Sequence, residues 1–107
     1  MHLANGINCQ HLLSADTIQR ISGREWGVSP EGLRSKTRTQ AFTVPRQLAM
    51  YFMRELLGMQ LVEIGNTFGG RDHSTVIHSL ERVVAHMREE PAFSQRIGQL
   101  RASFETL

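Results

Sequence analysis

The sequence predicts an all-α fold, a compact helical bundle that contains a helix-turn-helix. Apolar residues recur at intervals of three and four through most of the chain, and no stretch alternates apolar with polar residues as a half-buried strand does. Glycine and proline divide this pattern into pieces of helix length. A chain of 107 residues holds one modest core. We therefore expect one domain over residues 14–107, after a linker remnant or disordered N-terminus over residues 1–13.

The first expected helix begins at Ser14, a good N-cap residue, and runs to about Trp26, with Gly27 ending it. Ile18, Ile21 and Trp26 would face the core. The sequence Ser29-Pro30-Glu31 then opens a short helical turn that reaches Leu33.

Residues 34–44 are mostly polar and basic, and they are expected to form a loop. Pro45 fits the first turn of the next helix, where a missing N–H costs nothing. A wide apolar stripe follows, and Gly58 breaks the helix. The stripe consists of Leu48, Ala49, Phe52, Met53, Leu56 and Leu57.

Two amphipathic segments flank a glycine turn and fit a helix-turn-helix. Residues 61–68 carry Leu61, Ile64 and Phe68 at helical spacing, and Gly69-Gly70 would form the turn. Asp72 is the expected N-cap of the second helix. Its buried face is expected to hold Val76, Ile77, Leu80, Val83, Val84 and Met87. Its opposite face is expected to hold Arg71, His73, Ser74, Thr75, His78, Ser79 and Arg82.

A last helix can begin at Pro91. Phe93, Ile97, Leu100 and Phe104 recur on one side of it, so this helix is expected to pack on the helix before it.

The charge of the chain is only mildly basic, with a formal net charge of +2, so it does not by itself establish a nucleic-acid partner. Its distribution is more informative. Residues 32–54 contain five basic side chains and no acidic one. Such a run is either a solvated face or a phosphate-binding patch.

Several chemistries are disfavoured by the sequence. The single cysteine, Cys9, excludes an internal disulfide and a zinc framework and fits a cytoplasmic protein. Residues 65–72 resemble a phosphate-binding loop but lack its Lys and Ser/Thr. Asp72, His73 and Ser74 are consecutive, so on a helix they diverge by about 100° per residue and cannot form a catalytic triad. We expect no catalytic residue, cofactor, metal or membrane span.

The decapeptide from Gly69 to His78, Gly-Gly-Arg-Asp-His-Ser-Thr-Val-Ile-His, resembles the signature of the C-terminal DNA-binding domain of the bacterial replication initiator DnaA. Further matches precede it in the order of that family: Ser35-Lys-Thr-Arg38, Pro45-Arg-Gln-Leu-Ala-Met-Tyr51, Arg54-Glu-Leu56, Glu63-Ile-Gly65 and Phe68. The resemblance covers about residues 14–90. It implies a Trp-repressor-like helix-turn-helix with double-stranded DNA as its partner.

The resemblance also implies which residues read bases. The major groove would be read by Arg71, Asp72, His73, Ser74 and Thr75, whose donors, acceptors and methyl group match those that base edges present. Asp72 can serve as a helix cap, as a base contact, or as both.

A loop arginine of this family enters the adjacent minor groove, and Arg38 occupies its place. The alternative is a solvated loop residue. Lys36, Arg46, Gln47 and Arg82 would bind phosphates and fix the register. Gly70 is a candidate for a phosphate contact through the helix N-terminus, or it only shapes the turn. His78 contacts phosphate or a deeper base, or it is solvated.

The chain departs from the family pattern at two places. Thr37, Gln40 and Val44 stand where arginines are common, so affinity and salt dependence should be lower than is typical. Gln60-Leu-Val-Glu63 replaces Ser/Thr-Leu-Pro-Glu, which is expected to remove a capping box.

The implied function is binding of the DnaA box, an A·T-containing duplex of TTATNCACA type, at a bacterial replication origin or at promoters carrying such boxes. The protein would be cytoplasmic and nucleoid-associated, and the initiator's ATPase domain would be a partner if this chain is a fragment. One alternative is a stand-alone box-binding competitor or transcription regulator. Another is a helix-turn-helix used as a protein-interaction module.

Overall fold

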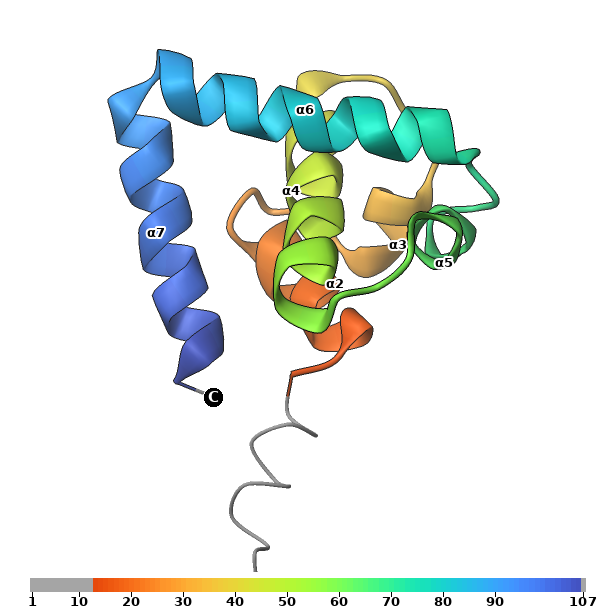
Figure 1. Cartoon of the computed structure of the whole chain (residues 1–107), viewed down its shortest axis with the longest axis horizontal. Helices are drawn as coiled ribbons and strands as arrows, with labels where there is room; N and C mark the ends of the chain where they lie inside the picture. Colours follow the sequence, from red (N-terminus) through yellow and green to blue (C-terminus); the bar gives the residue numbers. More distant parts are fainter. Residues whose placement is uncertain (1–12, 107) are drawn as a thin grey trace, which may run out of the picture.

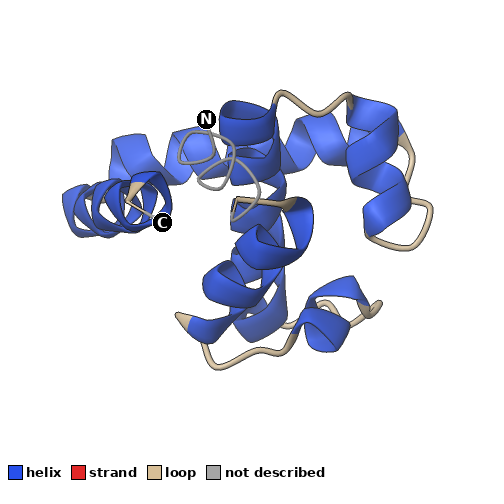
Figure 2. Ribbon diagram, turned by 90° about the horizontal axis from the view of Figure 1, so that it is seen from below, coloured by secondary structure: helices blue, strands red, loops and turns tan. Residues whose placement is uncertain are grey.

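The computed structural model describes residues 13–106, and this part of the chain forms helices joined by short loops without any strand (Figures 1 and 2). The all-α prediction is confirmed. The expected linker remnant or disordered N-terminus over residues 1–13 lies, except for Leu13, outside the described residues. The helices are α2 (Ala15–Arg24), α3 (Pro30–Arg34), α4 (Gln40–Leu57), α5 (Leu61–Thr67), α6 (His73–Glu89) and α7 (Pro91–Glu105).

The core is built around α4, which passes through the middle of the molecule with α6 lying across it (Figure 1). Leu48, Ala49, Phe52 and Met53 are fully buried, as their helical spacing predicts. α2 packs against a second side of α4. Burial on several sides makes α4 the element that positions the others.

α4 begins at Gln40, five residues before the expected start, so the prediction of a loop over residues 34–44 is wrong from Gln40 onward. Pro45 lies inside the helix rather than in its first turn, and it removes the N–H that would reach the carbonyl of Ala41. Phe42 and Val44 are half-buried against the core, and Pro45 itself is buried. Tertiary packing therefore extends the helix through a proline that the sequence pattern places at its start.

α2 follows the prediction at its first residue and deviates at its last. Ser14 caps it by accepting from the N–H of Thr17 at 3.2 Å, whereas the helix ends at Arg24 instead of near Trp26. Trp26 lies in the following turn and is only half-buried, with the guanidinium of Arg96 4.1 Å from its ring centroid. That contact ties the start of the domain to α7.

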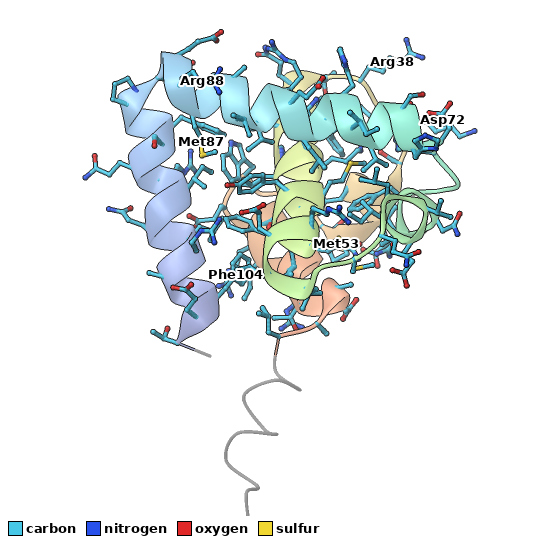
Figure 3. All side chains as sticks on the ribbon, viewed as in Figure 1. Arg38, Met53, Asp72, Met87, Arg88 and Phe104 are labelled. Atoms are coloured by element: carbon cyan, nitrogen blue, oxygen red, sulfur yellow. The ribbon has the colours of Figure 1, made fainter. Side chains whose placement is uncertain are left out.

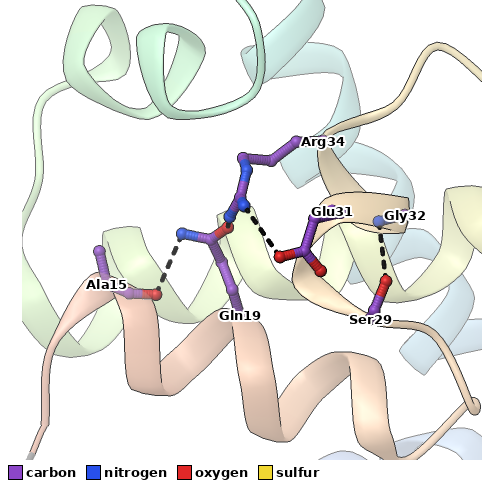
Figure 4. Close-up of polar contacts among 6 residues, drawn as sticks. All are labelled: Ala15, Gln19, Ser29, Glu31, Gly32 and Arg34. Carbon is purple, nitrogen blue, oxygen red and sulfur yellow. Dashed lines mark hydrogen bonds and ion pairs between the residues drawn. The ribbon is translucent and has the colours of Figure 1, made fainter.

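A polar network joins α2 to α3 (Figure 4). Gln19 is buried. Its amide donates to the carbonyl of Ala15 at 3.3 Å and accepts from Arg34 Nη1 at 2.8 Å. Ser29 caps α3, as its position predicts, by accepting from the N–H of Gly32 at 3.1 Å. These bonds fix the end of α3, from which the basic segment departs.

The turn between α5 and α6 is organised by Gly65. Its carbonyl accepts from the N–H groups of Phe68, Gly70 and Arg71, at 3.0 to 3.1 Å. A Cβ atom at position 65 would overlap the carbonyl oxygen of Arg71. Only glycine allows α5 and the turn to approach so closely. The helix-turn-helix predicted from residues 61–88 is therefore present, with a tight internal contact.

The start of α5 corrects one expectation. The N–H of Gln60 donates to Glu63 Oε1 at 2.9 Å, so the Glu63 half of a capping box is kept although Gln replaces Ser or Thr.

α6 confirms Asp72 as its N-cap and Val76 and Val83 as core residues. Ile77 and Val84 are 38% and 37% exposed, so their predicted burial is wrong. Ser79, predicted to be on the open face, is buried, and its hydroxyl donates to the carbonyl of Thr75 at 3.0 Å. That internal bond satisfies the serine and allows the helix to turn this side toward α4.

α7 has the predicted buried face, which consists of Phe93, Ile97, Leu100 and Phe104. It follows α6 at a sharp corner and descends along the side of the bundle (Figure 1). The rings of Phe104 and Phe52 lie 4.9 Å apart, edge to face. Phe104 therefore joins the far end of α7 to α4.

Replacing Gly65 with alanine should lower the free energy of unfolding by about 1–3 kcal/mol, because the added methyl group overlaps the Arg71 carbonyl. Urea unfolding measures this directly. Gly98→Ala is the matched control: no atom lies within 4 Å of a Cβ there, and alanine in a helix should add about 0.5–1 kcal/mol. Equal effects at the two positions would contradict the role assigned to Gly65.

Asp72 should make thermal stability depend on pH in the acid range. The Thr75 N–H, and secondarily the Ser74 hydroxyl, hold the pKa of Asp72 below its ordinary value. The stabilisation is therefore complete above the unfolded pKa of about 3.9 and is lost as the pH falls through the lower native pKa. The melting temperature of the wild type should fall relative to that of Asp72→Asn, whose cap does not titrate. A constant difference between the two down to about pH 2 would refute this role of the carboxylate.

Candidate nucleic-acid interface

A groove of about 640 Å³ separates α4 from the first turns of α6. We call it the α4–α6 groove. The basic segment before α4, the turn before α6 and both helices contribute to it. Its lining residues are Arg38, Thr43, Arg46, Gln47, Met50, Arg71, Ser74, Thr75, His78 and Ser79. The structure thus brings together seven of the site residues that the sequence predicts, although they are far apart in the chain.

A smaller cavity of about 270 Å³, the basic cleft, adjoins this groove and shares Arg38, Arg46 and Arg71 with it. The remaining residues that line the basic cleft are Arg34, Lys36, Phe68, Gly69 and Gly70. Five cationic side chains therefore line the basic cleft. Neither cavity has an acidic side chain in its lining.

Three predicted site residues lie outside both cavities. Asp72 at the N-cap of α6, His73 in its first turn and Arg82 further along the helix are all exposed. Figure 3 shows Asp72 and Arg38 at the same end of the molecule. His78 lines the α4–α6 groove, yet its side chain is 78% exposed and lies 4.0 Å from Glu81 Oε1.

Arg46 and Arg71 are held by the protein itself. Arg46 is buried and donates to the carbonyls of Leu33 at 2.6 Å and Ser35 at 2.8 Å. Arg71 is half-buried and donates to the carbonyls of Phe68 at 3.1 Å and Ser35 at 3.0 Å. Both guanidinium groups thus meet at one carbonyl oxygen, a connection that the sequence pattern does not reveal.

The glycine turn also uses its donors internally. Gly69 and Gly70 have φ values of 87° and 79°, which glycine adopts without strain. The Gly70 N–H donates to the carbonyl of Gly65 at 3.1 Å. The backbone donor that the sequence offers for a phosphate is therefore already engaged in the turn.

Electrostatics differ between the buried and exposed ends of the site. Burial, reinforced by the charge of Arg71, lowers the pKa of Arg46 from its ordinary value. Hydrogen bonds from Thr75 and Ser74 lower the pKa of Asp72 and keep it ionised. An acidic cap thus stands beside a strongly cationic groove, and it presents a hydrogen-bond acceptor among the donors.

Sequence reasoning missed Thr43, Met50 and Arg34 as lining residues. Thr43, Gln47 and Met50 recur at helical spacing on α4, but the assumption that residues 34–44 form a loop hid this pattern. Arg34 was seen only as part of the basic run. Its guanidinium is divided between Gln19, at 2.8 Å, and Glu31, at 3.9 Å (Figure 4).

The arrangement suits binding of a polyanion rather than catalysis. The α4–α6 groove combines cations with the hydroxyls of Ser74 and Thr75 and the ring of His78. In residues 13–106, no three His, Cys, Asp or Glu side chains come together as a metal site requires. No helix in this part of the chain is long and apolar enough to cross a membrane.

Comparison with known proteins agrees with this geometry. Residues 15–83 match the family described as the bacterial dnaA protein helix-turn-helix. The fold is similar to a solved structure titled as a crystal structure of a DNA replication initiation factor, with a TM-score of 0.77 and 26% sequence identity. The match covers 86% of this chain and 28% of that chain, so the sequence spans less than a third of that protein's length. The helix-turn-helix is a DNA-binding fold, with no catalytic role. The chain belongs to the bacterial dnaA protein helix-turn-helix family.

Proposed function

We propose that this domain binds the DnaA box, a short A·T-containing DNA duplex, and so places a replication initiator on the bacterial origin. The observation that carries the proposal is the meeting of Arg38 with Ser74, Thr75 and His78 around one groove. The first turns of α6 and the basic segment that carries Arg38 lie side by side. This arrangement suits a helix in the major groove with a basic loop in the adjacent minor groove.

The first turns of α6 supply the base-reading surface in this proposal. His73, Ser74 and Thr75 are exposed, and His73 can donate to purine N7 while Thr75 offers a methyl group to thymine. Asp72 keeps its capping bond to the Thr75 N–H, and its second oxygen is available to cytosine N4. Arg71 would release one of its internal carbonyl partners to reach guanine.

Arg38 enters the minor groove in this proposal, since it is exposed on the segment that precedes α4. A narrow A·T-rich groove concentrates negative potential and attracts such a side chain. Lys36, Gln47 and His78 contact phosphates from the linings of the α4–α6 groove and the basic cleft. Arg82, exposed further along α6 and outside both cavities, contacts another phosphate. Because its N–H is engaged by Gly65, Gly70 contributes the shape of the turn more than a donor.

The domain could act in either of two kinds of protein, a multidomain initiator or a stand-alone DNA-binding protein. In an initiator, a separate ATPase domain would act on the origin that this domain marks, and the protein would be associated with the nucleoid. In a stand-alone protein, the same surface would occupy boxes as a competitor or transcription regulator. The cationic lining argues against a third setting, a protein-docking module, for partners other than acidic ones.

The proposal predicts preference for a DnaA-box duplex over a scrambled duplex by at least about 4 kcal/mol. Arg38→Ala and His73→Ala should each remove part of that preference, because each would delete a groove contact worth about 1–3 kcal/mol. Fluorescence anisotropy with both duplexes measures it. Equal affinity for the two duplexes would leave a nonspecific basic surface or a protein-docking module instead.

Phosphate contacts should appear in the salt dependence without changing specificity. Lys36→Ala should reduce the slope of log K against log salt by about 0.9 and weaken the box and the scrambled duplex alike. Arg20→Ala removes an exposed cation of α2 that lines neither cavity, so its slope should match the wild type. Identical slopes for all three proteins would exclude Lys36 from the interface.

A further inference from the structure

The carbonyl oxygen of Ser35 is a junction between two parts of the site. It accepts from Arg46 Nη2 at 2.8 Å and from Arg71 Nη2 at 3.0 Å. Arg46 extends from α4, and Arg71 lies in the turn before α6. Ser35 itself ends α3 and begins the segment that carries Lys36 and Arg38. One carbonyl therefore links this segment, α4 and the helix-turn-helix.

The guanidinium donors of Arg46 are directed into the protein, unlike those of a phosphate ligand. A phosphate-binding arginine presents its donors to solvent, whereas Arg46 is only 5% exposed and directs two of them to the carbonyls of Leu33 and Ser35. Burying a guanidinium is costly unless its donors are paired. The fork geometry of arginine allows it to donate to two carbonyls two residues apart at once, which a lysine cannot do in the same way.

The segment after Ser35 is anchored at its far end by Thr39, the N-cap of α4, whose carbonyl accepts from the N–H groups of Phe42 and Thr43 at 3.0 and 2.9 Å. Between Ser35 and Thr39 it has few contacts. Lys36, Thr37, Arg38 and Thr39 are all exposed. The Thr37 N–H makes one long bond of 3.4 Å to Ser35 Oγ, and that hydroxyl in turn donates to the carbonyl of Gly32 at 2.7 Å. The direction in which the segment leaves α3 is thus set at Ser35, where Arg46 holds the carbonyl.

We infer that Arg46 is a positioning residue. Its hydrogen bonds to the carbonyls of Leu33 and Ser35 orient the Lys36–Thr39 segment, and with it Arg38. This inference rests on the proposed function for its effect on DNA, although the effect on the segment belongs to the free protein. Arg71 also donates to the carbonyl of Ser35, so the path of the segment is coupled to the turn before α6. Arg46 then contributes to minor-groove reading without touching the DNA.

The first test uses the free protein. Arg46→Met keeps the aliphatic stem and removes the donors, so the backbone order parameters of residues 36–39 from ¹⁵N relaxation should fall from about 0.8 to below about 0.6. Arg54→Met is the matched control, since Arg54 also lies on α4 and donates to a main-chain carbonyl, that of Met59 at 2.7 Å, but lines neither cavity. Unchanged order parameters in Arg46→Met would overturn the inference.

The second test is a double-mutant cycle on box DNA. If Arg46 acts through the segment, adding Arg46→Met to a variant that already carries Lys36→Ala and Arg38→Ala should change affinity less than twofold, although Arg46→Met alone weakens box binding several-fold. A phosphate ligand would instead give additive losses and a further fall of about 0.9 in the salt slope. Additivity would overturn the inference.

Arg46→Lys also distinguishes positioning of the segment from phosphate binding, and it replaces Arg46→Met in both tests if that variant does not fold. A lysine keeps the charge that binds a phosphate, but it cannot donate to both carbonyls as arginine does. The order parameters of residues 36–39 and the preference for box DNA should therefore stay below those of the wild type. Full recovery of both would contradict positioning. If the wild type shows no box preference, the proposed function fails, while the order parameters still decide the role of Arg46.

Discussion

Three N–H groups, those of Phe68, Gly70 and Arg71, donate to the carbonyl of Gly65, and the site depends on this contact. It closes the turn so tightly that no side chain fits at position 65. The angle between α5 and α6 follows from it, and so does the position of Arg71 beside the segment after α3. With α6 held across α4, the groove lies between two packed helices. A preformed groove loses less conformational entropy on binding than a flexible one does.

The cations of the site divide into two groups. Arg34, Arg46 and Arg71 have partners inside the protein, and they hold together α2, α3, α4 and the turn. Lys36, Arg38 and Arg82 are exposed. The first group lines the basic cleft and adds positive potential, whereas the second would meet the phosphates and the minor groove in the proposed complex. This division explains how a chain with a net charge of only +2 presents a concentrated basic surface.

The sequence predicted the helical class, the caps at Ser14 and Asp72, the short helix opened by Ser29-Pro30-Glu31, the helix-turn-helix and the buried face of α7. Local periodicity and capping determine these features. It misplaced the start of α4, since Pro45 looks like a first-turn residue and only packing of Phe42 and Val44 extends the helix. Burial of Ser79 in place of Ile77 depends on the angle at which α6 crosses α4, which no local pattern specifies. The internal bonds of Arg46 join residues distant in sequence, so they too needed the fold.

In the proposed complex, the α4–α6 groove and the basic segment before α4 form the face that meets box DNA. Amide chemical-shift changes mapped across the chain during titration with a DnaA-box duplex test this placement. We expect the largest changes to cluster at residues 36–39, 43–47 and 71–78 and to leave the outer face of α7 unaffected. Changes centred on α7 and the second half of α6, with the groove unaffected, would contradict it.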